Sequence, residues 1–165
     1  MAIKSGCYLQ KHSKMYLLDT TTDQPLRLVQ VADETVHPYA ILSHVWLQCN
    51  EEEVTFRDID ERKSYRRKCG YQKILHACRR AQQDGLKYIW IDTCCIDKRS
   101  SAELQEAITS MYQWYHSGQV CYVHLSDVFT STCPSSKEIA VPTDATHDAG
   151  WRKEVAKSIW FKRGW

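Results

Sequence analysis

Long hydrophobic runs are missing from this sequence, and their absence excludes the simplest membrane and secretory classes. No window approaches the ~20 apolar residues that a helix needs to span a bilayer. The first residues, MAIKSGCYLQKHSK, also lack the apolar segment of a secretory signal peptide. We therefore expect no membrane span and a cytoplasmic location, where cysteine thiols stay reduced.

Spacings that are typical of metal sites and phosphate-binding loops are missing as well. The eight cysteines are scattered, apart from the adjacent Cys94 and Cys95, and no CxxC or HxxxH pair occurs. No GxGxxG or GxxxxGKS/T segment is present, which excludes the usual phosphate-binding loops. We expect no metal site, and we interpret most cysteines as small buried hydrophobic residues.

Glycine and proline are few, with six and four residues among 165, which argues against a disordered or fibrous chain. Hydrophobic residues make up 43% of the sequence, enough for the core of a single domain that covers the whole chain. The net charge of +2 is too small to predict a nucleic-acid partner. We interpret the basic cluster of Arg62, Lys63, Arg66, Arg67 and Lys68 as a solvated face, with a binding patch as the alternative.

Hydrophobic patterns alternate between strand-like and helix-like segments along the chain. A hairpin is expected at 14–32, ahead of a core at 38–128. The expected strands lie at 39–46, 87–91 and 120–125, the expected helices at 71–83, 101–117 and 151–165, a short edge strand or turn at 54–59, and a loop or insertion at 129–150. This order predicts an α/β fold: a mostly parallel sheet flanked by helices on both faces, with an N-terminal β-hairpin.

Polar side chains follow each of the three predicted core strands. In a parallel sheet the carboxyl ends of the strands meet at one edge, where binding and catalytic groups gather. The residues expected at this rim are Ser43, His44 and Trp46 at the end of the first strand, Asp92, Cys94, Cys95 and Asp97 after the second, and Ser126 and Asp127 after the third. The sequence therefore predicts one candidate functional site built from segments that are far apart in the chain.

The rim residues have both chemical and structural interpretations. Ser43, His44 and Asp92 suggest a nucleophile, a base and an acid, but adjacent strand residues point to opposite faces, which favours structural hydrogen bonding. Asp92 is expected to accept hydrogen bonds from backbone N–H groups of the next loop, or to contact a ligand. A reactive thiol at Cys94 or Cys95 is opposed by the neighbouring carboxylates.

Five segments carry a family resemblance. In order, YAILSHVW, KYIWIDTCCIDK, ELQEAITSMYQWY, VCYVHLSDV and SIWFKRGW resemble the blocks of the fungal heterokaryon-incompatibility (HET) domain, from about residue 39 to 165. Two positions depart from the family pattern. Leu47 stands where a glycine usually follows Trp46, and Asp97 and Lys98 replace an Asn–Gln pair. The second departure places an acid beside a base where the family has two amides.

The resemblance implies an intracellular signalling module that triggers cell death when genetically different hyphae fuse. HET domains are thought to be distantly similar to TIR domains, which implies a flavodoxin-like sheet, homotypic assembly and, in some members, cleavage of NAD. The implied partner is a second copy or a homotypic HET or receptor domain. NAD is the candidate substrate, and no cofactor is otherwise implied.

The same resemblance places the catalytic glutamate of a TIR-type enzyme beyond Trp165. An NAD glycohydrolase of this type would therefore be incomplete in this chain. Glu103 and Glu106 are poor substitutes, because both suit the first turn of a helix, where the helix dipole favours acidic side chains.

The C-terminal motif contains Trp160, Phe161, Arg163 and Trp165. We interpret its aromatic residues as core or as a self-association surface, and its arginine as able to bind a phosphate or a carboxylate. Three functions are therefore predicted, in this order: a death-effector domain that acts through self-association, an NAD-cleaving enzyme, and a plain nucleotide- or phosphate-binding domain.

Overall fold

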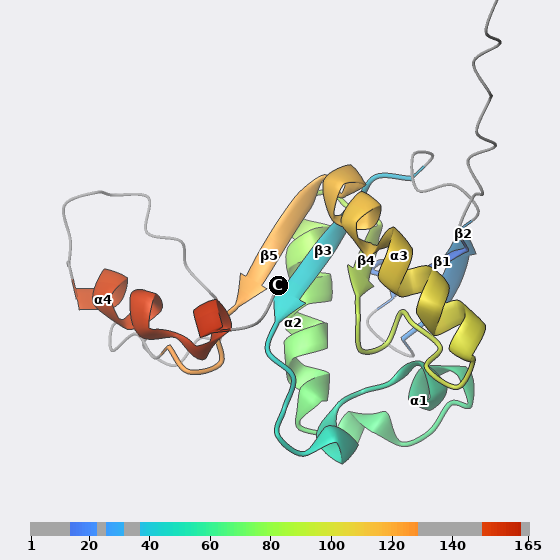
Figure 1. Ribbon diagram of the computed structural model, residues 1–165, viewed down its shortest axis with the longest axis horizontal. Coiled ribbons are helices and arrows are strands. Elements are labelled where there is room, and N and C mark those ends of the chain that lie inside the picture. The colour runs from blue at the N-terminus through green and yellow to red at the C-terminus, as the bar shows by residue number, and fades with distance from the viewer. Residues whose placement is uncertain (1–13, 23–25, 32–36, 129–149, 163–165) are drawn as a thin grey trace, which may run out of the picture.

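The computed structural model describes residues 14–22, 26–31, 37–128 and 150–162 of the chain. Its centre is a five-stranded sheet (Figure 1). The strands are β1 Met15–Asp19, β2 Leu28–Val31, β3 Tyr39–His44, β4 Tyr88–Ile91 and β5 Val120–His124, in the spatial order β2-β1-β4-β3-β5. The three predicted core strands are confirmed close to their expected bounds.

The sheet is mixed. β3 pairs in parallel with β4 and β5, whereas β1 pairs antiparallel with β2 and β4. The α/β class and the N-terminal hairpin are confirmed, but parallel pairings make up only half of the sheet. The hairpin joins this sheet by pairing Leu18 with Ile89, and its own alternating pattern contains no information on where it attaches. The flavodoxin/TIR-like assignment remains a prediction.

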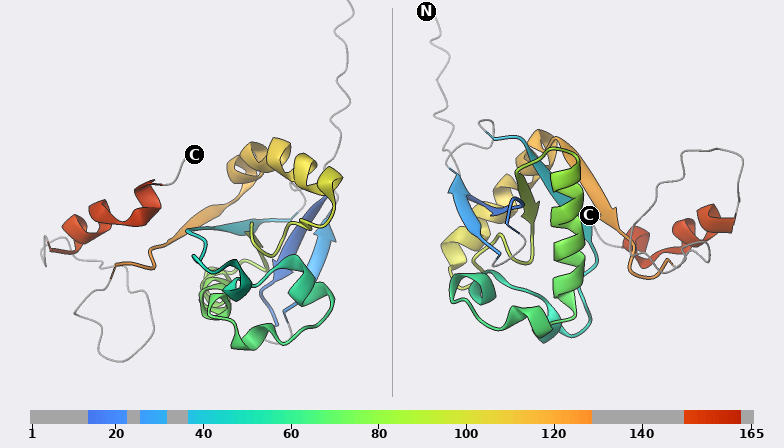
Figure 2. Two further views of the ribbon diagram at one scale, coloured as in Figure 1. Left: turned by 60° about the horizontal axis from the view of Figure 1, so that its bottom comes forward. Right: turned by 180° about the vertical axis from the view of Figure 1, so that it is seen from behind.

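Two long helices cover opposite faces of the sheet, as Figure 1 and, from behind, Figure 2 show. α2 spans Gly70–Gln83 and α3 spans Ser101–Ser117. α2 precedes β4 along the chain, and α3 connects β4 to β5. The predicted helices on both faces are therefore confirmed.

The ends of these helices follow local signals in the sequence. The Ser100 hydroxyl accepts a hydrogen bond from the Glu103 N–H at 3.3 Å, which caps the start of α3. Gly85 follows α2 with a φ of +77°, a conformation that glycine adopts without steric cost. These two signals explain why the helix bounds agree with the sequence pattern.

Aromatic packing fixes α3 against the sheet. Trp90 of β4 and Trp114 of α3 are both buried, with ring centroids 5.6 Å apart. The Tyr39 hydroxyl donates to the Trp114 carbonyl at 2.7 Å. Gly118, where α3 ends, allows a close approach, because a Cβ there would lie 2.7 Å from Cδ1 of Ile41. The C-terminal end of α3 is thereby held beside β3.

A helix replaces the short edge strand or turn that we predicted between β3 and α2. α1 spans Phe56–Asp60 and begins with a capping box. The Thr55 hydroxyl accepts from the Asp58 N–H at 3.4 Å, and the Asp58 carboxylate accepts from the Thr55 N–H at 2.8 Å. The prediction was wrong because this helix is too short to show a periodic pattern, although the Thr-x-x-Asp spacing was visible.

The C-terminal segment contains α4, Gly150–Lys157, which Figure 1 shows beyond the β5 edge of the sheet, on the side away from the hairpin. The predicted helix at 151–165 is therefore divided, and residues 163–165 and the insertion at 129–149 lie outside the described residues. The short 3₁₀ helices are η1 Asn50–Glu52, η2 Tyr65–Arg67 and η3 Ile159–Lys162. Within the described ranges, no helix has the length and apolar character needed to cross a membrane.

Candidate functional site

The ends of β3 and β4 bring a carboxylate together with two aromatic side chains. Leu42 of β3 is paired with Ile91 of β4, so the residues that follow them lie side by side. His44 Nε2 lies 2.9 Å from Asp92 Oδ1, and the Trp46 indole N–H donates to Asp92 Oδ2 at 2.9 Å. Both oxygens of this carboxylate are therefore bound by side chains from the end of β3 and the residues after it.

Lys98 completes this group, which we call the rim cluster: His44, Trp46, Asp92 and Lys98. The Lys98 ammonium lies 3.7 Å from the centre of the Trp46 ring, within cation–π distance. Burial raises the pKa of Asp92, but hydrogen bonds from His44 and Trp46 and the charge of Lys98 outweigh it, so this pKa lies below its usual value. Burial lowers the pKa of the Lys98 ammonium, and the charge of Asp92 opposes that shift.

The rim cluster has a buried side and an exposed side. His44 is fully buried, and the Asp92 side chain is 13% exposed, whereas Trp46 is 44% exposed. In the described part of the chain, the donors to Asp92 are these side chains and not the backbone N–H groups of its own loop that we expected. Asp92 therefore ties two strand ends together and holds the Trp46 indole in one orientation.

Ser43 and His44 have different partners on opposite faces of β3. The Ser43 hydroxyl accepts from the Trp160 indole N–H at 3.1 Å, while His44 contacts Asp92. The alternation of side chains along a strand produces this separation. The geometry favours structural hydrogen bonding over the interpretation as a nucleophile, a base and an acid.

Asp127, which follows β5, anchors the C-terminal segment. Its Oδ1 accepts from the Ser158 hydroxyl at 2.7 Å, and its Oδ2 accepts from the Ile159 N–H at 2.8 Å. These hydrogen bonds lower the pKa of the Asp127 carboxyl. The third strand end therefore holds η3 against the rim.

In the C-terminal motif, Trp160 contacts the sheet and Phe161 is exposed to solvent. Trp160 reaches Ser43, and its ring meets that of Phe161 edge to face at 5.0 Å. Phe161 is 55% exposed. Arg163 and Trp165 lie outside the described residues, so their predicted roles stay predictions.

The cysteines only partly follow the expectation that most are buried. Burial raises the pKa of the Cys94 thiol well above its ordinary value, and the Cys95 sulfur accepts from the Ile91 N–H at 3.4 Å. Of the six described cysteines, Cys78, Cys94 and Cys95 are buried and Cys49, Cys69 and Cys121 are exposed. The geometry of the adjacent pair disfavours a reactive thiol. Within the described ranges, His, Cys, Asp and Glu form no group of three or more that would hold a metal ion.

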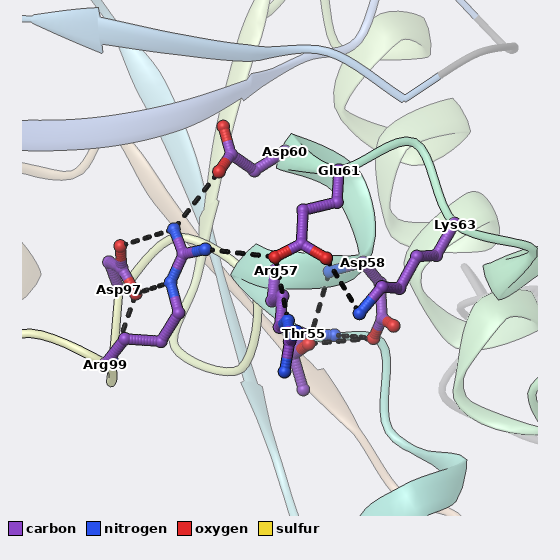
Figure 3. A network of polar contacts seen from close by, with 8 residues as sticks. All are labelled: Thr55, Arg57, Asp58, Asp60, Glu61, Lys63, Asp97 and Arg99. Carbon is purple, nitrogen blue, oxygen red and sulfur yellow. Dashed lines mark hydrogen bonds and ion pairs between the residues drawn. The ribbon is translucent and has the colours of Figure 1, made fainter.

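Asp97 belongs to a second polar cluster, which Figure 3 shows. Its carboxylate accepts from the Arg99 Nε at 2.8 Å and from Nη2 at 2.7 Å. The Arg99 guanidinium also lies 3.1 Å from Asp60 and 3.3 Å from Glu61, at the end of α1. Asp97 therefore does not share the contacts of the rim cluster, because its side chain turns toward α1.

A comparison with known families decides what kind of chain this is. Residues 39–165 match the family model described as heterokaryon incompatibility protein (HET). The chain belongs to the HET family. It is 45% identical over 130 residues to the vegetative incompatibility protein HET-E-1 of Podospora anserina, and this alignment covers 79% of the chain but only 9% of that relative. No solved structure matches the chain.

A buried ion pair between Glu53 and Lys73 is a feature of this HET chain that the sequence analysis missed. The Glu53 carboxylate also accepts the Leu47 N–H at 2.7 Å, so it fixes the loop that follows Trp46. Leu47 stands where the family resemblance leads us to expect a glycine, and this bond holds the loop in place. The missed signal is the position of Lys73 on the apolar stripe of α2, four residues before Ala77.

The space around this pair is tightly filled. Within the described residues, Oε2 of Glu53 has no hydrogen-bond partner. A Cβ at Gly70 would lie 2.8 Å from it, so a larger residue would force the pair to shift. At the end of β5, burial lowers the pKa of His124, and the nearby charge of Lys73 lowers it further. The carboxylates of Glu53 and Asp92 are therefore largely buried, whereas the Trp46 side chain is exposed.

Proposed function

We propose that this chain is a signalling domain of heterokaryon incompatibility, which acts in the cytoplasm and triggers cell death through self-association. Membership of the HET family and similarity to a protein named for vegetative incompatibility support this proposal. The alignment covers 9% of that relative, so the proposal concerns only the part of such a protein that this chain represents.

The fixed, exposed indole of Trp46 carries the self-association step. Asp92 accepts its N–H at 2.9 Å and Lys98 lies 3.7 Å from its ring centre, yet 44% of the residue is exposed. Tryptophan is enriched among the residues that dominate binding at protein interfaces. A side chain that is already held in one orientation also loses little conformational entropy on binding. The rim cluster thus supports an aromatic anchor for a second copy.

Self-association is tested by measuring the molar mass of the purified chain by light scattering over a range of concentrations. We expect the mass of the wild type to rise with concentration and that of Trp46→Ala to stay at the monomer value. Tyr112→Ala is the matched control, because Tyr112 is an 80% exposed aromatic residue on α3, outside the rim cluster. A monomeric wild type, or an equal loss in both variants, would overturn self-association through Trp46.

The death signal is tested separately by inducible expression in a filamentous fungus, with hyphal viability as the readout. We expect Trp46→Ala to lose the killing seen with the wild type, and to regain it when fused to a module that forces dimerisation. A wild-type chain that fails to kill even as a forced dimer contradicts the death-effector proposal.

NAD cleavage is a second candidate, favoured by the position of His44 and Asp92 at the carboxyl ends of two parallel strands. The reaction would use water to release nicotinamide and leave ADP-ribose. Asp92 already binds two donors, which supports a positioning role rather than direct stabilisation of a ribosyl cation. Chromatographic detection of nicotinamide, with Asp92→Asn for comparison, tests this candidate, and no release by the assembled wild type rejects it.

A further inference from the structure

A pocket of about 780 Å³ is lined by the hairpin, by α1, by the segment that joins α1 to α2 and by the loop between β4 and α3. This volume falls within the range of small-molecule sites. Among the described residues that line it, five side chains are cationic and two are acidic, so this part of the lining is electropositive. No residue of the rim cluster lines it, which makes it a separate candidate site.

Two of the five cations already have acidic partners. The Arg99 guanidinium lies 2.7 Å from Asp97 and 3.1 Å from Asp60 (Figure 3). Lys63 Nζ lies 2.8 Å from Glu61, as the same figure shows. These contacts neutralise the positive charge of Arg99 and Lys63 and, among the described residues, leave the charge of the other three cations without an acidic partner.

The other three cations that line the pocket are Arg27, Arg62 and Arg66. We call this pocket the arginine pocket after them. All three are exposed, and none of them forms an ion pair within the described residues. Arg27 comes from the hairpin, whereas Arg62 and Arg66 follow α1, so the fold gathers them from two distant segments. Uncompensated guanidinium groups around one pocket are a signature of anion binding.

Arg62 has a backbone conformation that disfavours its own residue type. Its φ is +52°, in the left-handed region where glycine is preferred. The Arg62 N–H donates to the Ile59 carbonyl at 3.2 Å, and the Lys63 N–H donates to the Asp58 carbonyl at 2.8 Å. These two bonds form a Schellman motif that ends α1, in which the left-handed position is usually glycine.

The end of α2 shows the same motif with the usual residue. Gly85 has a φ of +77°, and its N–H donates to the Gln82 carbonyl at 3.0 Å. The Leu86 N–H donates to the Ala81 carbonyl at 2.8 Å. An arginine in the equivalent place after α1 indicates a role for its side chain, because strained residues concentrate at ligand sites.

We propose that the arginine pocket binds a small molecule that carries a diphosphate or bisphosphate group. A guanidinium donates two parallel hydrogen bonds to one phosphate, so three guanidiniums suit more than a single monophosphate. The chain contains no glycine-rich phosphate loop, and the arginine side chains supply the recognition that such a loop would give. This inference is independent of the proposed signalling function.

An aromatic wall is available for the remainder of the ligand. The rings of Tyr16 and Phe56 pack edge to face at 4.8 Å, and both residues line the pocket. Tyr16 is partly exposed, so an apolar or aromatic group attached to the phosphates would cover it. Pyrophosphate and a nucleoside diphosphate carry the same diphosphate group, but only the second has a base and a sugar that could cover these rings. Comparing their affinities therefore shows whether the aromatic wall contributes to binding.

Isothermal titration calorimetry of the whole chain with pyrophosphate, ADP and inorganic phosphate tests the proposal. We expect pyrophosphate to bind more tightly than phosphate, and ADP at least as tightly as pyrophosphate. Arg62→Gly and Arg66→Gln should each weaken pyrophosphate binding roughly tenfold or more, because each removes a charged hydrogen-bond donor. Arg67→Gln is the matched control, with the same charge change outside the pocket lining and an expected effect below about twofold.

Arg62→Gly keeps the test separate from folding, since glycine suits the left-handed position and the variant should be at least as stable as the wild type. No heat of binding from pyrophosphate or ADP at millimolar concentration would overturn the proposal. An equal loss of affinity in Arg67→Gln would overturn it too, because that result indicates a diffuse effect of surface charge.

Discussion

The rim cluster and the arginine pocket differ in how they place charged side chains. At the rim, Asp92 is nearly buried and binds two donors, and the Lys98 ammonium lies against the Trp46 ring. In the pocket, Arg62 and Arg66 are exposed and have no acidic partner within the described residues. The two regions therefore suit different tasks. The loop between β4 and α3 contributes to both, since it supplies Asp92 and Lys98 to the rim cluster and Asp97 and Arg99 to the pocket.

This difference indicates that the rim cluster has a structural role and that the arginine pocket is the candidate ligand site. A buried charge that is already paired cannot engage a ligand without losing its partner, which is energetically costly. Exposed cations carry no such cost, so they are available to an incoming anion. The segments that resemble the HET blocks thus build the support for Trp46, whereas the candidate ligand site lies largely in residues outside them.

The largest expected effect comes from breaking the buried ion pair that supports the loop after Trp46, compared with breaking an exposed pair at the arginine pocket. Lys73→Met leaves Glu53 buried and unpaired, so the free energy of unfolding should fall by about 3–5 kcal/mol. Lys63→Met removes the exposed partner of Glu61 at the pocket and should change the free energy of unfolding far less, because solvent screens an exposed ion pair. Urea unfolding of both variants checks this, and similar losses would remove the distinction between the two regions.

A smaller effect is expected from replacing Asp92 or Asp97, the two aspartates of the loop between β4 and α3. Asp92→Asn weakens the contacts with His44 and Trp46, and we expect a loss of about 2 kcal/mol. Asp97→Asn is the matched control, since its partner Arg99 is half exposed and keeps other acids nearby; its cost should stay below about 1 kcal/mol. Thermal and urea unfolding measure both, and a larger loss for Asp97→Asn would contradict the assignment of Asp92 as the organising carboxylate.

Acid should weaken the rim cluster in a way that depends on Asp92. The ordinary pKa of this carboxyl is 3.8, and its pKa in the folded chain is lower. The unfolded chain therefore takes up this proton at a higher pH, so the stabilisation from Asp92 is present above about pH 4 and is lost as the pH falls further. The urea midpoint of the wild type should drop more steeply below pH 4 than that of Asp92→Asn, and parallel curves would count against this role.

Local patterns in the sequence were sufficient for the core strands, the two long helices and the meeting of His44 with Asp92. Each of these depends on a short apolar run, a helical stripe or the order of parallel strands. The Glu53–Lys73 pair was missed because its partners are 20 residues apart and meet only after α2 packs. The pocket was missed because it needs the hairpin beside α1, and the pairing of β1 with β4 is a tertiary contact.

The smallest effect tests why an arginine ends α1 where a glycine ends α2. Arg62→Gly should raise the free energy of unfolding by about 0.5–1 kcal/mol, because relief of the left-handed strain outweighs the extra freedom of glycine in the unfolded chain. Gly85→Ala should lower it by about 1 kcal/mol, and a Cβ there meets no atom within 4 Å, so only backbone conformation contributes. Urea midpoints of both variants measure these opposite shifts. If Arg62→Gly were destabilising, the arginine side chain would be contributing to folding, and the strain at this position would no longer point to a ligand.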